Sequence, residues 1–139
     1  MSAIHDERMS RFRSAGLYLV TSGSLSEGRD TLFIVKEALA GGVHLIQLRE
    51  KDLSTRELLV LARKVRALTL EAGALLLLND RLDIALAVGA DGVHLGQDDL
   101  PVDTARVMAP DFIIGASSHS VAEAQEAQRL GASYVNIGP

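Results

Sequence analysis

The sequence predicts an α/β protein with a parallel sheet, because a helical segment, a glycine and a short apolar strand follow one another repeatedly. Four stretches share this order: residues 35–46, 66–78, 85–95 and 124–137. A glycine after a helix adopts the left-handed conformation that ends it. Helices that alternate with short apolar strands are typical of βα units, whose strands pair in parallel.

The expected elements follow from this alternation. Strands are expected at residues 17–21, 43–48, 75–78, 92–95, 112–116 and 134–137. Helices fill the gaps, and a further short helix is expected around residues 6–14. Ser54 with Glu57 forms a capping box for the helix that ends at Gly73, and Ser120 begins the last helix. No linker or low-complexity segment interrupts the pattern, so residues 1–139 are expected to form one domain.

The composition excludes several classes of protein. The chain has no cysteine, so it has no disulfide scaffold, thiol nucleophile or cysteine-bound zinc. Its net charge of −4 gives no general attraction to nucleic acid or to an anionic membrane. The longest apolar run, residues 74–78, is too short to span a bilayer, and the polar start is no signal peptide. We therefore expect a cytoplasmic protein whose partner is a small molecule.

Polar residues follow the expected strands rather than the helices. They stand at residues 47–51, 79–81, 96–99 and 115–119. The carboxyl ends of parallel strands lie on one face of the sheet, where active sites of α/β proteins are found. These residues are therefore the candidates for binding and catalysis.

Three of these polar residues predict an anion site. Gln47, Arg49 and Lys51 alternate in register with Leu45, so they share its face if the strand continues. A guanidinium and an ammonium at the mouth of a barrel would bind an anion, the first as a bidentate fork and the second as a point charge. The alternative is a loop of solvated charges before a helix.

Asp80 and Asp99 close consecutive βα units and admit two interpretations. Carboxylates beside two cations favour a hard metal ion together with a phosphorylated ligand. The alternative is helix capping: Asn79 or Asp80 could cap the helix that begins near Leu82, and Asp99 could cap a helix whose first turn contains Pro101.

The serine and histidine residues give no sign of nucleophilic catalysis. Ser117 has no evident activating partner, so we expect it to bind a ligand by a hydrogen bond or to cap a helix. His44 and His94 lie inside strands and are expected to face the helix layer. No pair of histidines has metal-ligand spacing, and no glycine-rich nucleotide loop is present.

Taken together, the strand-end motifs resemble the thiamine-phosphate synthase (thiamine-phosphate diphosphorylase) family. The matching stretches are residues 18–21, 47–52, 79–81, 90–101, 115–120 and 131–139. The resemblance covers nearly the whole chain and implies a (βα)8 TIM barrel. It also implies that this chain supplies about the first six βα units of an incomplete barrel, truncated after Pro139.

The resemblance implies a magnesium-dependent reaction. Enzymes of the family join hydroxymethylpyrimidine diphosphate to thiazole phosphate and release diphosphate. Arg49 and Lys51 would be the catalytic residues, and Asp80 and Asp99 would bind Mg²⁺. The residues implied to bind substrate are Gln47, Leu48, Arg49, Glu50, Lys51, Asn79 and Ser117.

Two alternatives and one further expectation remain at this stage. The alternatives are a thiazole tautomerase of the same fold and a non-catalytic fragment that binds a phosphorylated ligand. The cations beside Asp80 and Asp99 favour the synthase, since an isomerase expels no diphosphate. The family's thiazole-phosphate loops would follow Pro139, so the chain alone is expected to bind pyrimidine diphosphate weakly and to make little thiamine phosphate. Bare strand edges also invite pairing with another copy of the chain.

Overall fold

The computed structural model describes residues 1–139 and contains six strands, six α-helices and one short 3-10 helix. In chain order, the elements are α1 (Ala3–Ser14), β1 (Leu19–Val20), η1 (Gly23–Leu25), α2 (Thr31–Ala40), β2 (Leu45–Leu48), α3 (Thr55–Ala72), β3 (Leu75–Asn79), α4 (Leu82–Val88), β4 (Gly92–Leu95), α5 (Val102–Met108), β5 (Ile113–Ser118), α6 (Val121–Arg129) and β6 (Tyr134–Ile137).

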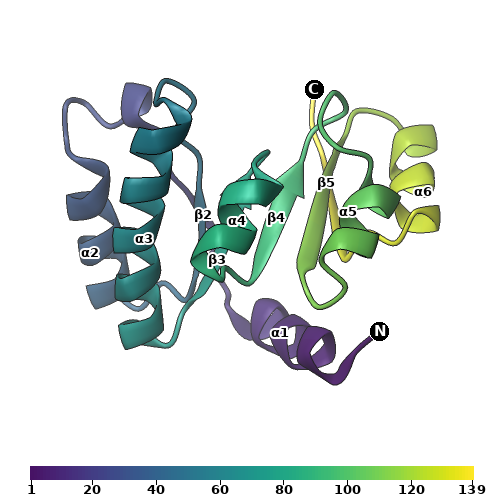
Figure 1. Cartoon of the computed structure of the whole chain (residues 1–139), viewed down its shortest axis with the longest axis horizontal. Coiled ribbons are helices and arrows are strands. Elements are labelled where there is room, and N and C mark those ends of the chain that lie inside the picture. Colours follow the sequence, from purple (N-terminus) through teal and green to yellow (C-terminus); the bar gives the residue numbers. More distant parts are fainter.

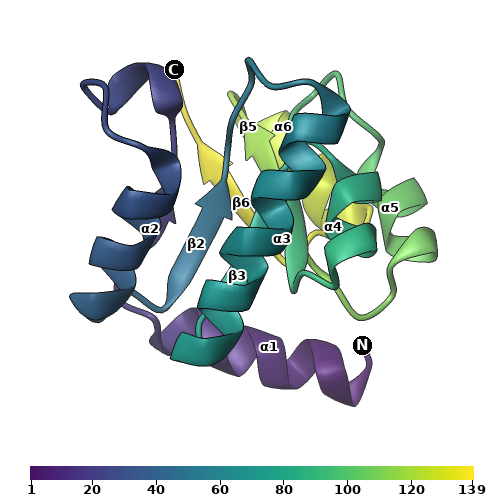
Figure 2. The ribbon, with the colours of Figure 1, turned by 60° about the vertical axis from the view of Figure 1, so that its left-hand side comes forward.

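The predicted parallel α/β arrangement is confirmed. All six strands pair in parallel in the order β1-β2-β3-β4-β5-β6. The sheet curls into an open half-barrel, with α2 to α6 on its outer side and α1 across the end at which the strands begin (Figure 1, Figure 2). β1 is shorter than expected. β3 extends to Asn79 and β5 to Ser118, at the end of the sheet opposite to α1.

The helix ends follow the signals in the sequence. Ser54 and Glu57 form the predicted capping box of α3, and Gly73 ends that helix in a left-handed conformation at φ 69°. The Ser120 side chain accepts from the Glu123 amide at the start of α6. The N-terminal helix begins earlier than expected, because the Ser2 hydroxyl caps it by accepting from the amide of His5.

Two apolar layers lie on the two faces of the sheet. The outer layer packs the sheet against the helices and includes Ile46, Leu76 and Ile114, all fully buried. The inner layer is smaller, and there Met9 of α1 packs with four strand residues: Leu45, Leu75, Leu77 and Ile113. Because side chains alternate along a strand, the next inward positions after this layer lead towards the polar strand ends.

An ion-pair cluster closes the end of the sheet where the strands begin. Asp91, directly before β4, accepts from Arg8 of α1 at 3.2 Å and from Arg66 of α3 at 3.0 Å. It also accepts from the Leu76 amide at 2.9 Å. This carboxylate therefore ties two helices and two strands together.

Helix length and polarity bear on membrane insertion. None of the helices combines the length and the apolar character that crossing a bilayer requires.

Candidate active site

The inner face of the sheet carries a row of hydrogen-bonded polar side chains just beyond its apolar layer. The amides of Asn79 and Gln47, on neighbouring strands, are 2.8 Å apart. His94 Nε2 lies 2.8 Å from Ser117 Oγ, and Gln97 donates to the Ser117 carbonyl oxygen at 2.8 Å. The structure thus places Gln47, Asn79 and Ser117 on one face, as their spacing indicates.

The prediction that His94 faces the helix layer is wrong. His94 pairs in register with Gly115 and Asn79, and its ring contacts Ser117 on the inner face. Strand alternation counted from Gln97 would put His94 on the outer face, but β4 ends at Leu95 and Gln97 lies in the turn beyond it. His44, just before β2, is exposed rather than packed against the helices.

Two tyrosines complete the row, and the sequence reasoning did not assign them to the site. The Tyr134 hydroxyl lies 2.7 Å from His94 Nδ1 and 2.7 Å from the Tyr18 hydroxyl. The Tyr134 ring stacks on Phe12 of α1 and lies over Gly115, where any Cβ would overlap it. Burial raises the pKa of both tyrosines, so both hydroxyls keep their protons. Gly115 leaves room for the ring of Tyr134 on the neighbouring strand, and this glycine is the sequence signal that could have indicated Tyr134 as an inner-face residue.

The cations follow β2. Arg49 and Lys51 line a cleft of about 340 Å³ together with Ser22, Gly23 and Ser24 of the loop after β1. Glu50, which lies between Arg49 and Lys51 in the chain, holds this loop in place. Its carboxylate accepts from the Thr21 hydroxyl at 2.9 Å and from the Thr31 hydroxyl at 2.8 Å.

Leu48 and Glu50, which the resemblance also implies to bind substrate, lie deeper in the structure than Arg49 and Lys51. Leu48 is fully buried in the outer apolar layer, so it supports the site from behind. Glu50 has both carboxylate oxygens engaged by threonine hydroxyls. The structure therefore brings Arg49 and Lys51 to the rim and gives Leu48 and Glu50 the contacts of supporting residues.

Asp80 and Asp99 lie near each other at the carboxyl ends of β3 and β4. Lys51 Nζ is 3.1 Å from Asp80 Oδ2. Burial and the neighbouring Asp80 carboxyl raise the pKa of Asp99, while the Gly96 amide, which donates to it at 2.8 Å, lowers that pKa. A carboxyl group whose ionisation is opposed by burial and by a neighbouring carboxyl favours binding of a cation.

Neither aspartate caps a helix. The residue preceding α4 is Arg81 and the residue preceding α5 is Pro101, and neither helix start has a side-chain cap. Asp80 instead adopts a left-handed backbone with φ 65°, a conformation that is costly for a residue with a Cβ. Ser117 is not a cap either, since Ser120 caps α6.

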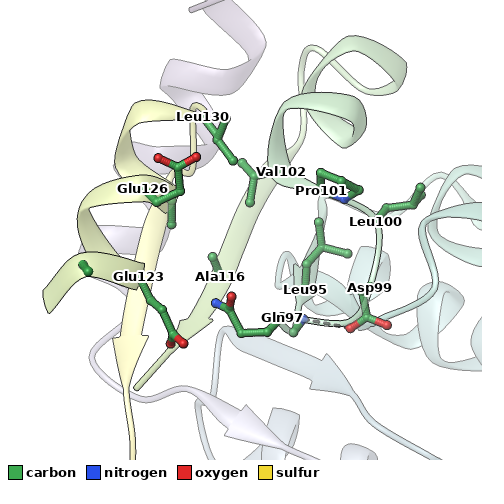
Figure 3. Close-up of a pocket in the computed structure, with 13 residues that line it drawn as sticks. Leu95, Gln97, Asp99, Leu100, Pro101, Val102, Ala116, Glu123, Glu126 and Leu130 are labelled. Carbon is green, nitrogen blue, oxygen red and sulfur yellow. Dashed lines mark hydrogen bonds between the residues drawn. The ribbon is translucent and has the colours of Figure 1, made fainter. Parts of the chain in front are cut away.

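A second cleft, of about 370 Å³, opens beside Asp99 between α5 and α6 (Figure 3). Its lining is mixed: Leu95, Val102 and Leu130 give it apolar surface, and the polar side chains that line it are Gln97, Asp99, Glu123 and Glu126. The strand ends therefore place cations beside Asp80 and a partly apolar cleft beside Asp99.

The donor set at the rim suits magnesium. No three or more histidine, cysteine, aspartate or glutamate side chains are placed so that they could hold a metal ion together. A pair of carboxylates is instead what Mg²⁺ uses when phosphate oxygens and water complete its shell. Asp80 and Asp99 provide such a pair, next to Lys51.

Comparison with known proteins gives one consistent result. The family model described as thiamine monophosphate synthase matches residues 17–139. A thiamine-phosphate synthase from Moorella thermoacetica is 52% identical over 123 residues, 88% of this chain and 59% of the relative. One from Methanospirillum hungatei JF-1 is 50% identical over 125 residues, 89% of this chain and 61% of the relative.

The solved structures agree. Thiamine phosphate pyrophosphorylase from Pyrococcus furiosus superposes with a TM-score of 0.83 at 44% sequence identity. The match covers 90% of this chain and 60% of that one. The chain spans about three-fifths of the length of the relatives it matches.

Proposed function

The chain belongs to the thiamine monophosphate synthase family, and from this premise we propose that it provides the pyrimidine-diphosphate half of a thiamine-phosphate synthase site. The reaction joins hydroxymethylpyrimidine diphosphate to thiazole phosphate and yields thiamine phosphate and diphosphate. The observation that carries the proposal is the meeting of two cations and two carboxylates at one end of the sheet.

We assign the diphosphate to the cleft beside Arg49 and Lys51. The guanidinium offers two parallel donors to phosphate oxygens, and the exposed ammonium can follow the group as charge moves onto it. Ser22, Gly23 and Ser24 add hydroxyl groups and backbone to the same cleft. Gln47, Asn79 and Ser117 face the inner side, where they would contact the pyrimidine.

Asp80 and Asp99 would hold magnesium through their carboxylate oxygens. When bound, the ion supplies positive charge to the phosphate oxygens. Lys51 contacts Asp80, so the ammonium and the carboxylates meet the diphosphate together.

The chemistry requires stabilisation of a leaving group rather than a protein nucleophile. When the bond between the pyrimidine methylene and the diphosphate breaks, negative charge collects on the diphosphate, and the aminopyrimidine stabilises the cation. The thiazole nitrogen then attacks the methylene carbon. Charged donors fixed where this charge develops lower the barrier, and loss of one such group costs about 3–4 kcal/mol.

The other functions considered have less support. The curated relatives reported above are thiamine-phosphate synthases, which does not favour a tautomerase. A tautomerase also expels no diphosphate, so its reaction does not require a site that stabilises negative charge on a leaving diphosphate. We propose that the complete fold is the eight-stranded barrel of the family, and that the thiazole phosphate binds to strands outside this chain.

A chimera tests the proposed function. Residues 17–139 would replace the corresponding segment of the Moorella thermoacetica relative, and release of diphosphate would be measured with both substrates and Mg²⁺. We expect turnover that falls by at least about 100-fold when Arg49 is changed to alanine, as for loss of a group that stabilises the transition state. Arg63→Ala, at an exposed position of α3 within the transplanted segment, provides the folding control. Turnover that is insensitive to Arg49→Ala would contradict the proposal.

A further inference from the structure

The inner polar row forms one unbroken line of hydrogen bonds from Asn79, at the carboxyl end of β3, to Ser117. The successive contacts are Asn79 to Gln47 (2.8 Å), Gln47 to Tyr18 (2.9 Å), Tyr18 to Tyr134 (2.7 Å), Tyr134 to His94 Nδ1 (2.7 Å) and His94 Nε2 to Ser117 (2.8 Å). Each interior member uses its polar atoms within the line.

Such a line has only two possible directions. Each hydroxyl has one proton to donate, and a neutral imidazole has one N–H and one acceptor nitrogen. If one member reverses, its neighbours must reverse as well, or a buried hydroxyl proton loses its acceptor or two like groups face each other. Burial lowers the pKa of His94, which keeps the ring neutral and the rule intact.

Asp80 sets the direction at one end. With the Asn79 amide nitrogen towards Gln47, the Asn79 carbonyl oxygen faces the Asp80 carboxylate, which can only accept. Turned over, the Asn79 nitrogen donates to Asp80 Oδ2 at 3.0 Å, and its carbonyl oxygen faces Gln47 at 2.8 Å. Gln47 must then turn its nitrogen to Asn79 and its carbonyl oxygen to Tyr18.

The remaining protons follow in order. With Gln47 turned over from the orientation in which its nitrogen donates to Tyr18, the Tyr18 hydroxyl donates to the Gln47 carbonyl oxygen, so it accepts from Tyr134. Tyr134 has then used its only proton, so it accepts from His94 Nδ1–H. His94 Nε2 carries no proton and accepts from the Ser117 hydroxyl.

We propose that Tyr18, Tyr134 and His94 are positioning residues that hold Ser117 as a hydrogen-bond acceptor on its open side. Ser117 is half-buried, and with its proton on His94 it presents lone pairs to a bound molecule. The ligand group it selects is an N–H donor. Under the proposed function, that donor is the amino group of the pyrimidine. Only this identification of the donor rests on the proposed function.

Nitrogen NMR of the 139-residue chain with ¹⁵N-labelled histidine tests the inference. The chemical shifts distinguish a protonated from a bare ring nitrogen, and a His94→Gln sample identifies the His94 signals. We expect His94 to carry its proton on Nδ1. In Tyr18→Phe, Tyr134 loses its acceptor and turns its proton to His94 Nδ1, so the His94 proton should move to Nε2.

This shift is specific to the hydrogen-bond line, since Tyr18 does not contact His94 through any hydrogen bond. Phe12→Leu is the matched control: Phe12 packs on both tyrosines but has no hydroxyl, so the His94 tautomer should not change. Protonation of His94 on Nε2 in the unmodified protein, or an unchanged tautomer in folded Tyr18→Phe, would overturn the inference. If Tyr18→Phe does not fold, the tautomer of the unmodified protein decides alone. The readout needs no turnover, so failure of the proposed function leaves it unaffected.

Discussion

The two ends of the sheet use carboxylates in opposite ways. Asp91, where the strands begin, is saturated by two guanidinium groups and a backbone amide, and its side chain is 7% exposed. Asp80 and Asp99, where the strands end, lie beside a single ammonium, that of Lys51. A carboxylate whose partners are complete stabilises the fold, whereas a pair with surplus negative charge remains able to bind a cation.

The largest effect on stability is expected at the saturated end. Asp91→Ala leaves Arg8 and Arg66 without their carboxylate, and removal of one partner from a buried ion pair costs about 3–5 kcal/mol of unfolding free energy. Urea denaturation measures this loss. Asp83→Ala, which breaks an exposed pair with Arg81, should cost less than about 1 kcal/mol. Equal losses in both variants would remove the distinction between the two ends.

Asp80→Gly should separate stability from binding. Glycine tolerates the left-handed backbone at φ 65°, so the unfolding free energy should rise by up to about 1 kcal/mol. Loss of the carboxylate should weaken magnesium-dependent binding of diphosphate by at least about tenfold, the effect of one charge-assisted contact. Denaturation and calorimetry on one sample test both parts. Clear destabilisation would mean that Asp80 supports the fold as Asp91 does.

Acidification should weaken the fold through the inner row. The pKa of His94 is lowered from 6.5, chiefly by burial, so the folded state binds a proton less readily than the unfolded state. The stability it contributes is present above pH 6.5 and is lost as the pH falls towards the folded pKa. Denaturation at about pH 7.5 and about pH 5.5 measures the decrease. His94→Gln should make that decrease smaller, and an unchanged pH dependence would contradict the buried neutral ring.

The smallest effect on stability is expected at Lys51. Its side chain is 53% exposed, so its pair with Asp80 is screened by solvent, and Lys51→Gln should change the unfolding free energy by less than about 0.5 kcal/mol. Binding of diphosphate should nevertheless weaken and lose part of its salt dependence. A destabilisation comparable with that of Asp91→Ala would show that Lys51 is structural.

The fold was largely predictable from the sequence because its signals are local. Ser54, Glu57 and Gly73 mark their helix by capping and by a left-handed turn, and strand alternation placed Gln47 on the inner face with Leu45. Each of these signals depends only on residues nearby in the chain.

The site was less predictable, because its contacts join residues far apart in the chain. Tyr134 meets Tyr18 across 116 positions and His94 across 40. No spacing rule links such residues before the sheet curls. The left-handed backbone of Asp80 was equally invisible, since aspartate between a strand and a helix usually indicates a cap.

The most direct test of the account is calorimetric titration of inorganic diphosphate into the chain, with Mg²⁺ and with a chelator. The unmodified protein should bind magnesium diphosphate at least about tenfold more tightly than free diphosphate, as a charge-assisted site requires. Asp80→Asn combined with Asp99→Asn should remove this preference while the protein remains folded. A preference for magnesium that survives in the double variant would contradict the claim that these two carboxylates form the metal site.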